Sequence, residues 1–134
     1  GKSVMDLGCG TAVLGILAAK LGAGSVSAVD IDATAVRSAL GNIRLNGLDF
    51  EVVCSDASAL KEDAYDVLLS NIHKNIIISD LPRYRKALRR GGKLLLSGFY
   101  DRDADEIAAV ADGLGFTLLS SCSSNGWACL RFCK

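Results

Sequence analysis

The sequence predicts an α/β fold, with one doubly wound, mostly parallel β-sheet and helices on both faces. Apolar strand-like segments alternate with helical patterns along the whole chain. Segments such as Val67-Leu68-Leu69 are continuously apolar, which is typical of parallel strands buried on both faces. The 134 residues, half of them apolar, suffice for one domain with a substantial core and exclude a disordered chain.

Seven strands are expected from short apolar runs bounded by glycine or polar residues. They cover residues 3–7, 25–29, 50–54, 65–70, 93–97, 116–122 and 127–133. The last two flank Asn125-Gly126, a dipeptide typical of two-residue hairpin turns. The chain is therefore expected to consist of five βα units followed by a hairpin.

Helical patterns follow several of these strands. Residues 12–21 are apolar on nearly all sides and predict a buried helix. Another helix is expected over about residues 75–90, kinked or broken at Pro82. Apolar residues at helical spacing indicate two more helices. One contains Val36, Leu40 and Ile43, and the other contains Ile107, Val110 and Leu114.

Charge and cysteine content exclude several classes of protein. Fifteen basic residues balance fifteen acidic ones, which disfavours a nucleic-acid-wrapping protein. No apolar run reaches the roughly 20 residues of a membrane helix, and the start lacks the pattern of a signal peptide. The five cysteines contain no Cys-x-x-Cys pair, so neither a metal site nor a disulfide framework is expected. We expect a cytoplasmic protein with free thiols and no membrane contact.

The most informative segment runs from Val4 to Ala12 and reads as strand, glycine-rich turn and helix. In a doubly wound sheet such a turn lies where ligands bind, and Gly8 and Gly10 allow close approach of the backbone. The dinucleotide fingerprint requires a third glycine where Val13 stands, which argues against a bound pyrophosphate. Asp6, just before the turn, would repel phosphates and suits a cationic or amine-bearing ligand.

Two further acids follow the next two strands. Asp30 ends the second strand, where a carboxylate can accept hydrogen bonds from both hydroxyls of a ribose. Asp56 follows the third strand, where a carboxylate can accept from the amino group of adenine. Three acids at three successive strand ends, without phosphate-binding glycines, describe an adenosine pocket that holds no pyrophosphate.

These motifs resemble those of the Rossmann-like S-adenosylmethionine-dependent methyltransferases, and the resemblance covers the whole chain. It implies a seven-stranded sheet of order 3-2-1-4-5-7-6 with strand 7 antiparallel, S-adenosylmethionine as cofactor and S-adenosylhomocysteine as product. Asp6 and the glycine turn would hold the methionine part, Asp30 the ribose and Asp56 the adenine. One departure is Ala12, where the family more often has a third glycine. The implied cofactor-binding residues are Asp6, Gly8, Cys9, Gly10, Thr11, Asp30, Ile31, Asp56, Ala57 and Asn71.

Three further strings are similar to a narrower family, the bacterial methyltransferases of large-ribosomal-subunit protein eleven. They are Ser70-Asn71-Ile72-His73-Lys74-Asn75-Ile76, Ser97-Gly98-Phe99-Tyr100 and Asn125-Gly126-Trp127-Ala128-Cys129-Leu130. The resemblance implies an N-methyltransferase that acts on amino groups, on lysine side chains and the N-terminus, of a ribosomal protein. That family carries an N-terminal substrate-recognition domain. Residues 1–134 are therefore expected to form a single S-adenosylmethionine-binding domain that, without the N-terminal domain, methylates its protein substrate poorly or not at all.

In amino-methylating relatives the corresponding strand end reads Asn-Pro-Pro-aromatic, and the asparagine carbonyl accepts a hydrogen bond from the substrate nitrogen. Asn71-Ile72 keeps the asparagine and lacks the prolines. This resemblance implies that Asn71 is the catalytic residue. His73 is expected to cap a helix or face solvent rather than act as a base. Phe99 or Tyr100 either walls the pocket or packs, and Trp127 is expected to pack rather than stack on a ligand. Cys9 is expected to fill space in the loop, because methyl transfer needs no covalent intermediate.

Several alternatives remain open at this point. The chain could methylate another protein or a small molecule, or it could be a cofactor-binding module that is inactive without a further domain. A nicotinamide-dependent oxidoreductase is disfavoured by Val13 and Asp6. We expect a monomer. The basic residues near the end of the third helix either contact ribosomal RNA weakly or simply follow the helix dipole, and they are Arg83, Arg85, Lys86, Arg89, Arg90 and Lys93.

Overall fold

The computed structural model describes residues 1–134, and its seven strands form one sheet of order β3-β2-β1-β4-β5-β7-β6. Parallel pairing joins β1 to β2 and β4, whereas β7 runs antiparallel to both of its neighbours, β5 and β6. The predicted sheet order and direction of strand 7 are confirmed. The strands are β1 (Ser3–Leu7), β2 (Ser25–Asp30), β3 (Glu51–Cys54), β4 (Tyr65–Asn71), β5 (Leu88–Tyr100), β6 (Thr117–Ser124) and β7 (Trp127–Cys133).

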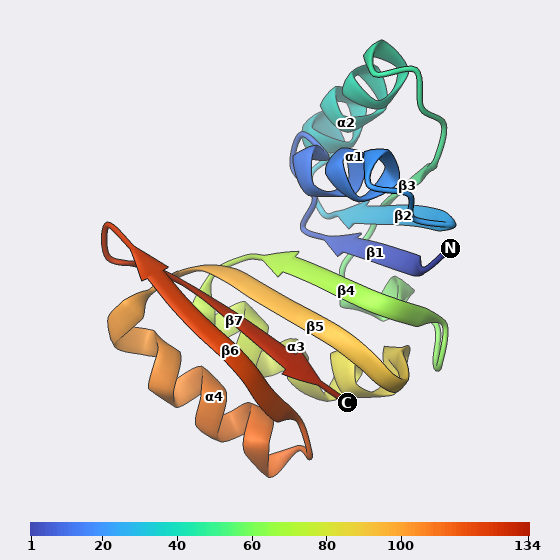
Figure 1. Ribbon diagram of the computed structural model, residues 1–134. Helices are drawn as coiled ribbons and strands as arrows, with labels where there is room; N and C mark the ends of the chain where they lie inside the picture. Colours follow the sequence, from blue (N-terminus) through green and yellow to red (C-terminus); the bar gives the residue numbers. More distant parts are fainter.

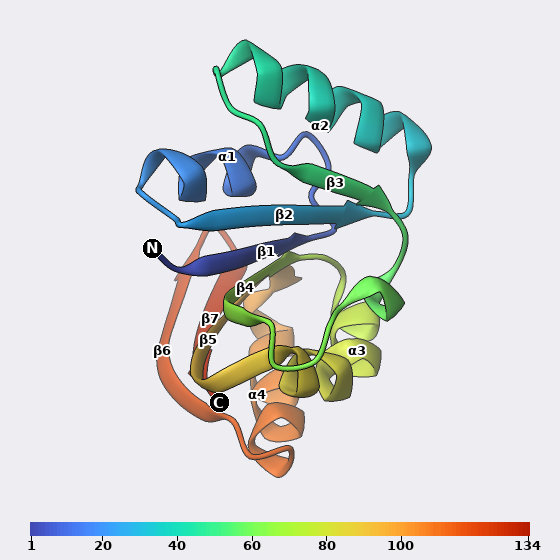
Figure 2. The same cartoon turned by 90° about the vertical axis from the view of Figure 1, so that its right-hand side faces the viewer.

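Helices lie on both faces of the sheet. Figure 2 shows α1 (Val13–Lys20) and α2 (Ala33–Leu45) on one side, against β1, β2 and β3. On the other side α3 (Lys74–Ala87) packs on β4 and β5, and α4 (Ala104–Gly113) packs on β6 and β7. The larger of two apolar cores lies under α3 and α4, and the smaller lies under α1 and α2. No helix is long and apolar enough to cross a membrane.

The smaller core explains why one expectation is wrong. Residues 12–21 were expected to form a buried helix, but in this segment Val13 is 63% exposed, Leu17 is 50% exposed and the C-cap residue Leu21 is 78% exposed. Only one face of α1 meets the sheet and the neighbouring helix, and it buries Gly15 and Ile16. The apolar sequence therefore predicted a helix correctly, but it did not indicate which face of the helix packs against the sheet.

Two connections also differ from expectation. The link between β3 and β4 contains only the 3₁₀ turn η1 (Ala57–Ala59), so one of the five expected βα units lacks an α-helix. The third helix ends at Ala87 rather than near residue 90, and it is one continuous helix through Pro82. Its last carbonyls, those of Lys86 and Ala87, accept from the backbone N–H groups of Asp63 and Ala64, which redirects the chain into β5.

The final hairpin follows the prediction closely. Asn125 and Gly126 both have positive φ, 52° and 81°, as a type I′ turn requires. The turn fixes a register in which Ser124 pairs with Trp127 and Cys122 with Cys129. Both of these cysteines are free thiols. Figure 1 shows the hairpin tip on the side toward which the arrowheads of β1, β2 and β4 point.

Candidate active site

A cavity of about 670 Å³ lies at the carboxyl ends of the parallel strands. This volume is in the range of pockets that enclose a small organic ligand, roughly 300–1,000 Å³. The cavity lies where the chain switches direction along the sheet, between β1 and β4, which is the usual ligand site of doubly wound folds. Six predicted site residues line it, namely Gly8, Asp30, Ile31, Asp56, Ala57 and Asn71.

The glycine turn after β1 is held against the end of β2. The backbone N–H groups of Gly8 and Cys9 both donate to the carbonyl of Val29, at 2.8 and 3.0 Å. Gly8 has φ +69°, and a Cβ there would lie 2.6 Å from the side chain of Ile72. The positive φ therefore favours glycine at this position, and a larger residue would also force the side chain of Ile72 to move.

Asp30 links the turn to the cavity. Its Oδ2 accepts from the N–H of Gly10 at 2.9 Å, and its Oδ1 accepts from the N–H of Asp32 at 2.9 Å. A carboxylate has about four acceptor positions, so two hydrogen bonds leave capacity for a diol in the cavity. The position of Asp30 suits the predicted role of ribose acceptor.

Asp56 and Ala57 form the wall beside β3. Asp56 caps the turn η1, because its Oδ1 accepts from the N–H of Ser58 at 2.8 Å. Hydrogen bonding by Ser58, through its hydroxyl and its backbone N–H, holds the pKa of Asp56 below its usual value. Asp56 thus presents an ionised, acceptor-only group to the cavity, as recognition of an amino group requires.

Asp6 does not line the cavity but lies beneath the turn, 2% exposed. Its Oδ2 accepts from the N–H of Gly15 at 2.9 Å, in the first turn of α1. The N-cap residue of α1, Ala12, has no side chain that could accept there, so Asp6 caps the helix from the neighbouring strand. Burial raises the pKa of Asp6 to about 6, opposed by the Gly15 hydrogen bond and reinforced by the charge of Asp30.

Three other predicted residues also lie outside the cavity lining: Cys9, Gly10 and Thr11. Gly10 acts through its backbone bond to Asp30, and the carbonyl of Thr11 accepts from Asn42 at 3.0 Å. Cys9 is buried in the smaller core. Burial, with the charges of Asp6 and Asp30, raises the pKa of Cys9 to about 12. A neutral, buried thiol agrees with its expected role of filling space.

Asn71 stands at the end of β4 and lines the cavity beside β5, where it pairs with Ser97. The next residue of β5, Gly98, has φ +88°, and a Cβ there would lie 2.5 Å from Asn71 Oδ1. Gly98 therefore makes the space that the Asn71 amide occupies. The family-like string contained Gly98, but no spacing rule indicated that it would face Asn71.

Sequence reasoning missed several residues that line the cavity. Ile76 and Asp80 extend from one face of α3, one helical turn apart, and Ser97, Gly98 and Trp127 close the opposite end. His73 also lines the cavity, is exposed, and occupies the N-cap position of α3 without a side-chain capping bond. Phe99 packs in the larger core and does not wall the cavity. These positions depend on helix phase and hairpin register, which the sequence alone did not fix.

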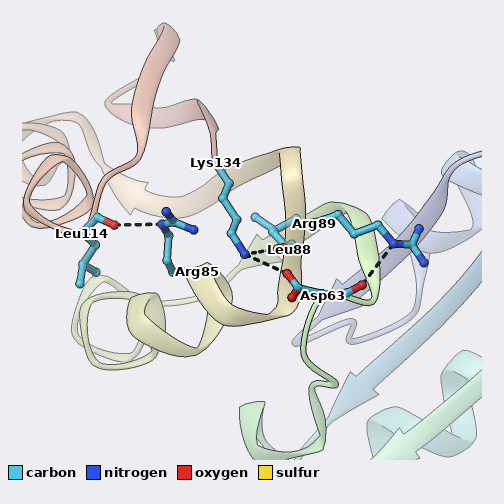
Figure 3. A network of polar contacts seen from close by, with 6 residues as sticks. All are labelled: Asp63, Arg85, Leu88, Arg89, Leu114 and Lys134. Carbon is cyan, nitrogen blue, oxygen red and sulfur yellow. Dashed lines mark hydrogen bonds and ion pairs between the residues drawn. The ribbon is translucent and has the colours of Figure 1, made fainter.

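Most of the basic residues proposed for RNA contact have partners within the chain. Figure 3 shows Arg85 donating to the carbonyl of Leu114 at 3.0 Å and Arg89 to that of Asp63 at 3.2 Å. Arg89 also forms an ion pair with Asp66 at 3.1 Å. In the same network Lys134 contacts Asp63 at 3.1 Å and the carbonyl of Leu88 (Figure 3). Arg89 and Lys134 thus fasten β5 and the last residue of the chain to the loop before β4, whereas Arg85 joins α3 to the end of α4, so these cations have a structural role.

The model of one protein family, described as ribosomal protein L11 methyltransferase (PrmA), matches residues 1–134. The chain belongs to the ribosomal protein L11 methyltransferase family. This confirms the family that the motifs around Asn71, Gly98 and Trp127 indicated. In that family setting, the cavity at the ends of β1 to β4 is the candidate site for the methyl donor.

Relatives in the family support the assignment over nearly the whole chain. A ribosomal protein L11 methyltransferase from Porphyromonas gingivalis is 46% identical over 134 residues, which cover 98% of this chain and 46% of the relative. The corresponding protein from Thermotoga maritima is 38% identical over 130 residues, 97% of this chain and 49% of the relative. The chain thus spans about half the length of the curated relatives it matches.

Solved structures agree with the fold. The ribosomal protein L11 methylase from Lactobacillus delbrueckii subsp. bulgaricus superposes with a TM-score of 0.93 at 26% identity, over 98% of this chain and 69% of that one. A methyltransferase from Pyrococcus furiosus, 21% identical, superposes at 0.86 over 99% of this chain and 75% of that one. The [4+2]-cyclase SpnF, 15% identical, reaches 0.84 over 100% of this chain and 74% of that one, so the fold alone does not determine the reaction.

Proposed function

We propose that this chain binds S-adenosylmethionine and transfers its methyl group to amino groups of ribosomal protein L11, on lysine side chains and the N-terminus. The observation that carries the proposal is the lining of one cavity by Asp30, Asp56 and Asn71, each at the carboxyl end of a different parallel strand. Membership of the L11 methyltransferase family supplies the substrate class.

The residues present suit this cofactor. Asp30 has free acceptor capacity for a ribose diol, and Asp56 offers an ionised carboxylate to an adenine amino group. Because Gly8 has no side chain, its backbone itself borders the cavity, next to Ile72. The buried carboxylate of Asp6 adds negative potential beneath the turn, which favours a cationic ligand over a phosphate.

When bound, S-adenosylmethionine would supply a methyl group to an amine, with a neutral thioether as leaving group. A lysine amine has a pKa of about 10.4 in water, so it must lose a proton before it can accept a methyl. Apolar neighbours such as Ile72 and Ile76 line the same cavity, and transfer of the amine from water to this environment favours its neutral form. Asn71 Oδ1 would accept from an amine hydrogen and orient the nitrogen lone pair.

We also propose that residues 1–134 form the cofactor-binding domain and that a separate N-terminal domain recognises the folded ribosomal protein. The roughly twofold greater length of the curated relatives supports this division. On this proposal the protein acts as a monomer in the cytoplasm, where ribosomal proteins are made.

The function is tested with a chimera in which residues 1–134 replace the matching half of the Porphyromonas gingivalis relative. The chimera is incubated with S-adenosylmethionine and ribosomal protein L11, and added methyl groups are counted by mass spectrometry. We expect methylation of lysine or N-terminal amines that is lost in Asn71→Ala and retained in Asn75→Ala, an exposed amide on α3 outside the cavity. Methylation by Asn71→Ala at the unchanged rate would contradict the role of Asn71, and transfer to other acceptors only would contradict the substrate.

A further inference from the structure

The single tryptophan of the chain, Trp127, lines the cavity and is nevertheless 51% exposed. It is the first residue of β7, next to Ala128, which also lines the cavity. Large aromatic side chains gain most of their stabilising effect from burial, so a half-exposed indole on a cavity wall is available to a ligand. Packing was expected for this residue, and the indole does pack on Tyr100, but about half of its surface remains open.

The ring of Trp127 packs against a second aromatic ring. Trp127 pairs with Tyr100 of β5, and the two rings stack with centroids 4.7 Å apart and planes at 26°. The guanidinium carbon of Arg102 lies 4.6 Å from the centroid of Tyr100. The hairpin tip is also fixed, because the N–H of Asp101 donates to the carbonyl of Gly126 at 2.9 Å. The stacking on Tyr100 therefore favours the rotamer in which the indole lines the cavity.

Trp127 and the acidic residues of the cavity lie on different parts of the sheet. Asp30 and Asp56 lie at the ends of β2 and β3, whereas Trp127 lies beyond β5 in the sheet order β3-β2-β1-β4-β5-β7. Gly98 of β5 and Ala128 line the cavity from the two strands that pair at this end, and Asn71 is on β4, between these strands and β1 in the sheet order. The tryptophan end of the cavity is thus free for the group that receives the methyl.

The charges around this end favour a cation. Four carboxylates lie on η2 (Asp101–Asp103) and the first turn of α4, the segment joined to the hairpin tip: Asp101, Asp103, Asp105 and Glu106. Lys74 pairs with Asp103 and Glu106, at 3.5 and 3.0 Å, and Arg102 is engaged with Tyr100. Asp101 and Asp105 are exposed and form no ion pair, so they add negative potential outside the cavity.

We infer that the open surface of Trp127 is the wall of the acceptor subsite, and that it takes the alkylammonium chain of a lysine. Tyr100 and Arg102 are positioning residues that act through the indole. An aromatic face binds the methylenes of such a chain through dispersion and its ammonium end through cation–π attraction. The lysine therefore enters as an ammonium, and its amine loses the proton before the methyl group is transferred. This inference rests on the proposed function and names the acceptor side of the same cavity.

The test uses the fluorescence of Trp127, the only indole in the chain. The protein is saturated with S-adenosylhomocysteine and titrated with N-acetyl-lysine methylamide, and binding is followed by indole emission and by calorimetry. We expect a saturable change in emission with the same midpoint as the heat signal. The uncharged analogue N-acetyl-norleucine methylamide should bind about 2- to 30-fold more weakly, the range that cation–π contacts span.

Three variants decide between a ligand wall and packing. Trp127→Ala should weaken the calorimetric affinity for the lysine analogue at least fivefold, and Trp127→Phe should recover part of it. Tyr100→Leu should weaken it less than Trp127→Ala. Leu118→Ala, an exposed apolar residue on β6, should change nothing. All variants should bind S-adenosylhomocysteine as the unmodified chain does, which shows that they fold.

Binding of the lysine analogue with unchanged affinity by Trp127→Ala would overturn the inference. So would binding measured by calorimetry with no response of the indole, or the absence of any binding by a chain that holds S-adenosylhomocysteine. In these cases the proposed function survives. A chain that binds neither S-adenosylhomocysteine nor S-adenosylmethionine would remove the proposed function itself, and the inference with it.

Discussion

The backbone of Gly98 lies so close to Asn71 that a Cβ at Gly98 would be 2.5 Å from Asn71 Oδ1. The same Cβ would lie 2.8 Å from the backbone nitrogen of Ile72. The bulge in β5 between Leu96 and Phe99 therefore creates the space in which the candidate catalytic amide stands. A strand irregularity next to an active site is a common way to re-aim a side chain.

Gly98→Ala should displace Asn71 and reduce methyl transfer at least about tenfold, because small misplacements of a positioning group are costly. Affinity for S-adenosylmethionine should change less, since Asp30 and Asp56 lie on other strands. The matched control is Gly91→Ala, which also has positive φ in β5, +76°, but has no atom within 4 Å of its Cβ position. Both variants lose about 1–2 kcal/mol to backbone strain, but only Gly98→Ala should lose activity. Equal activity in the two variants would contradict the role of Gly98.

Asp6→Asn should change how stability depends on pH. The pKa of Asp6 is about 6 in the folded protein, above its value of 3.8 when exposed. The unfolded chain therefore releases this proton first, and Asp6 makes the free energy of unfolding fall as pH rises from about 4 to 6. Asparagine keeps an acceptor for the Gly15 N–H without a charge, so the variant should gain up to about 3 kcal/mol relative to the native chain over this window.

The difference between Asp6→Asn and the native chain is measured by denaturant unfolding at pH 4 and at pH 7. Other carboxyls, such as Asp56, have lowered pKa values and act in the opposite direction, but they cancel in this difference. A difference that does not vary with pH would show that Asp6 is not buried as a charge. If the methionine part of the cofactor also needs this carboxylate, the same variant will bind S-adenosylmethionine more weakly while it is more stable.

Ala12→Gly tests the departure from the usual glycine of the turn. Ala12 is fully buried and has φ 66°, a left-handed conformation that costs an L-residue about 1–2 kcal/mol. Glycine removes this strain at the loss of one buried methyl, so stability should stay equal or rise by about 1 kcal/mol. Ala39→Gly, equally buried in the same small core but within α2, should lose about 1 kcal/mol or more. Thermal unfolding of both variants measures the contrast, and similar losses would contradict the account of the turn.

Features of the fold that depend on local sequence patterns were predicted, whereas those that depend on tertiary contacts were not. Apolar runs predicted all seven strands, and Asn125-Gly126 predicted the turn and the pairing of Cys122 with Cys129, because local chemistry fixes these features. The start of β5 was missed because Leu88, Arg89 and Arg90 continue a helical pattern. Only tertiary bonds from Asp63 and Ala64 to the carbonyls of Lys86 and Ala87 end that helix early.

Some residues of the candidate site could likewise be predicted from the sequence, and others could not. Residues at strand ends, such as Asp30, Asp56 and Asn71, were predicted because parallel strands bring their carboxyl ends to one edge. Ile76, Asp80 and Trp127 were not, since their place in the cavity depends on the rotation of α3 and the register of β7 against β5. The capping of α1 by Asp6 was also hidden, because it joins residues nine positions apart through space.

The most direct test of the central claim is a calorimetric titration of this chain with S-adenosylmethionine, with NAD as the comparison ligand. The account predicts saturable binding of S-adenosylmethionine alone. Asp30→Ala should weaken it at least about tenfold, the loss expected for hydrogen bonds to a charged acceptor. Asp32→Ala, which removes the cap of α2 outside the cavity, should leave it unchanged. Binding of NAD instead, or equal binding of S-adenosylmethionine by Asp30→Ala, would contradict the account.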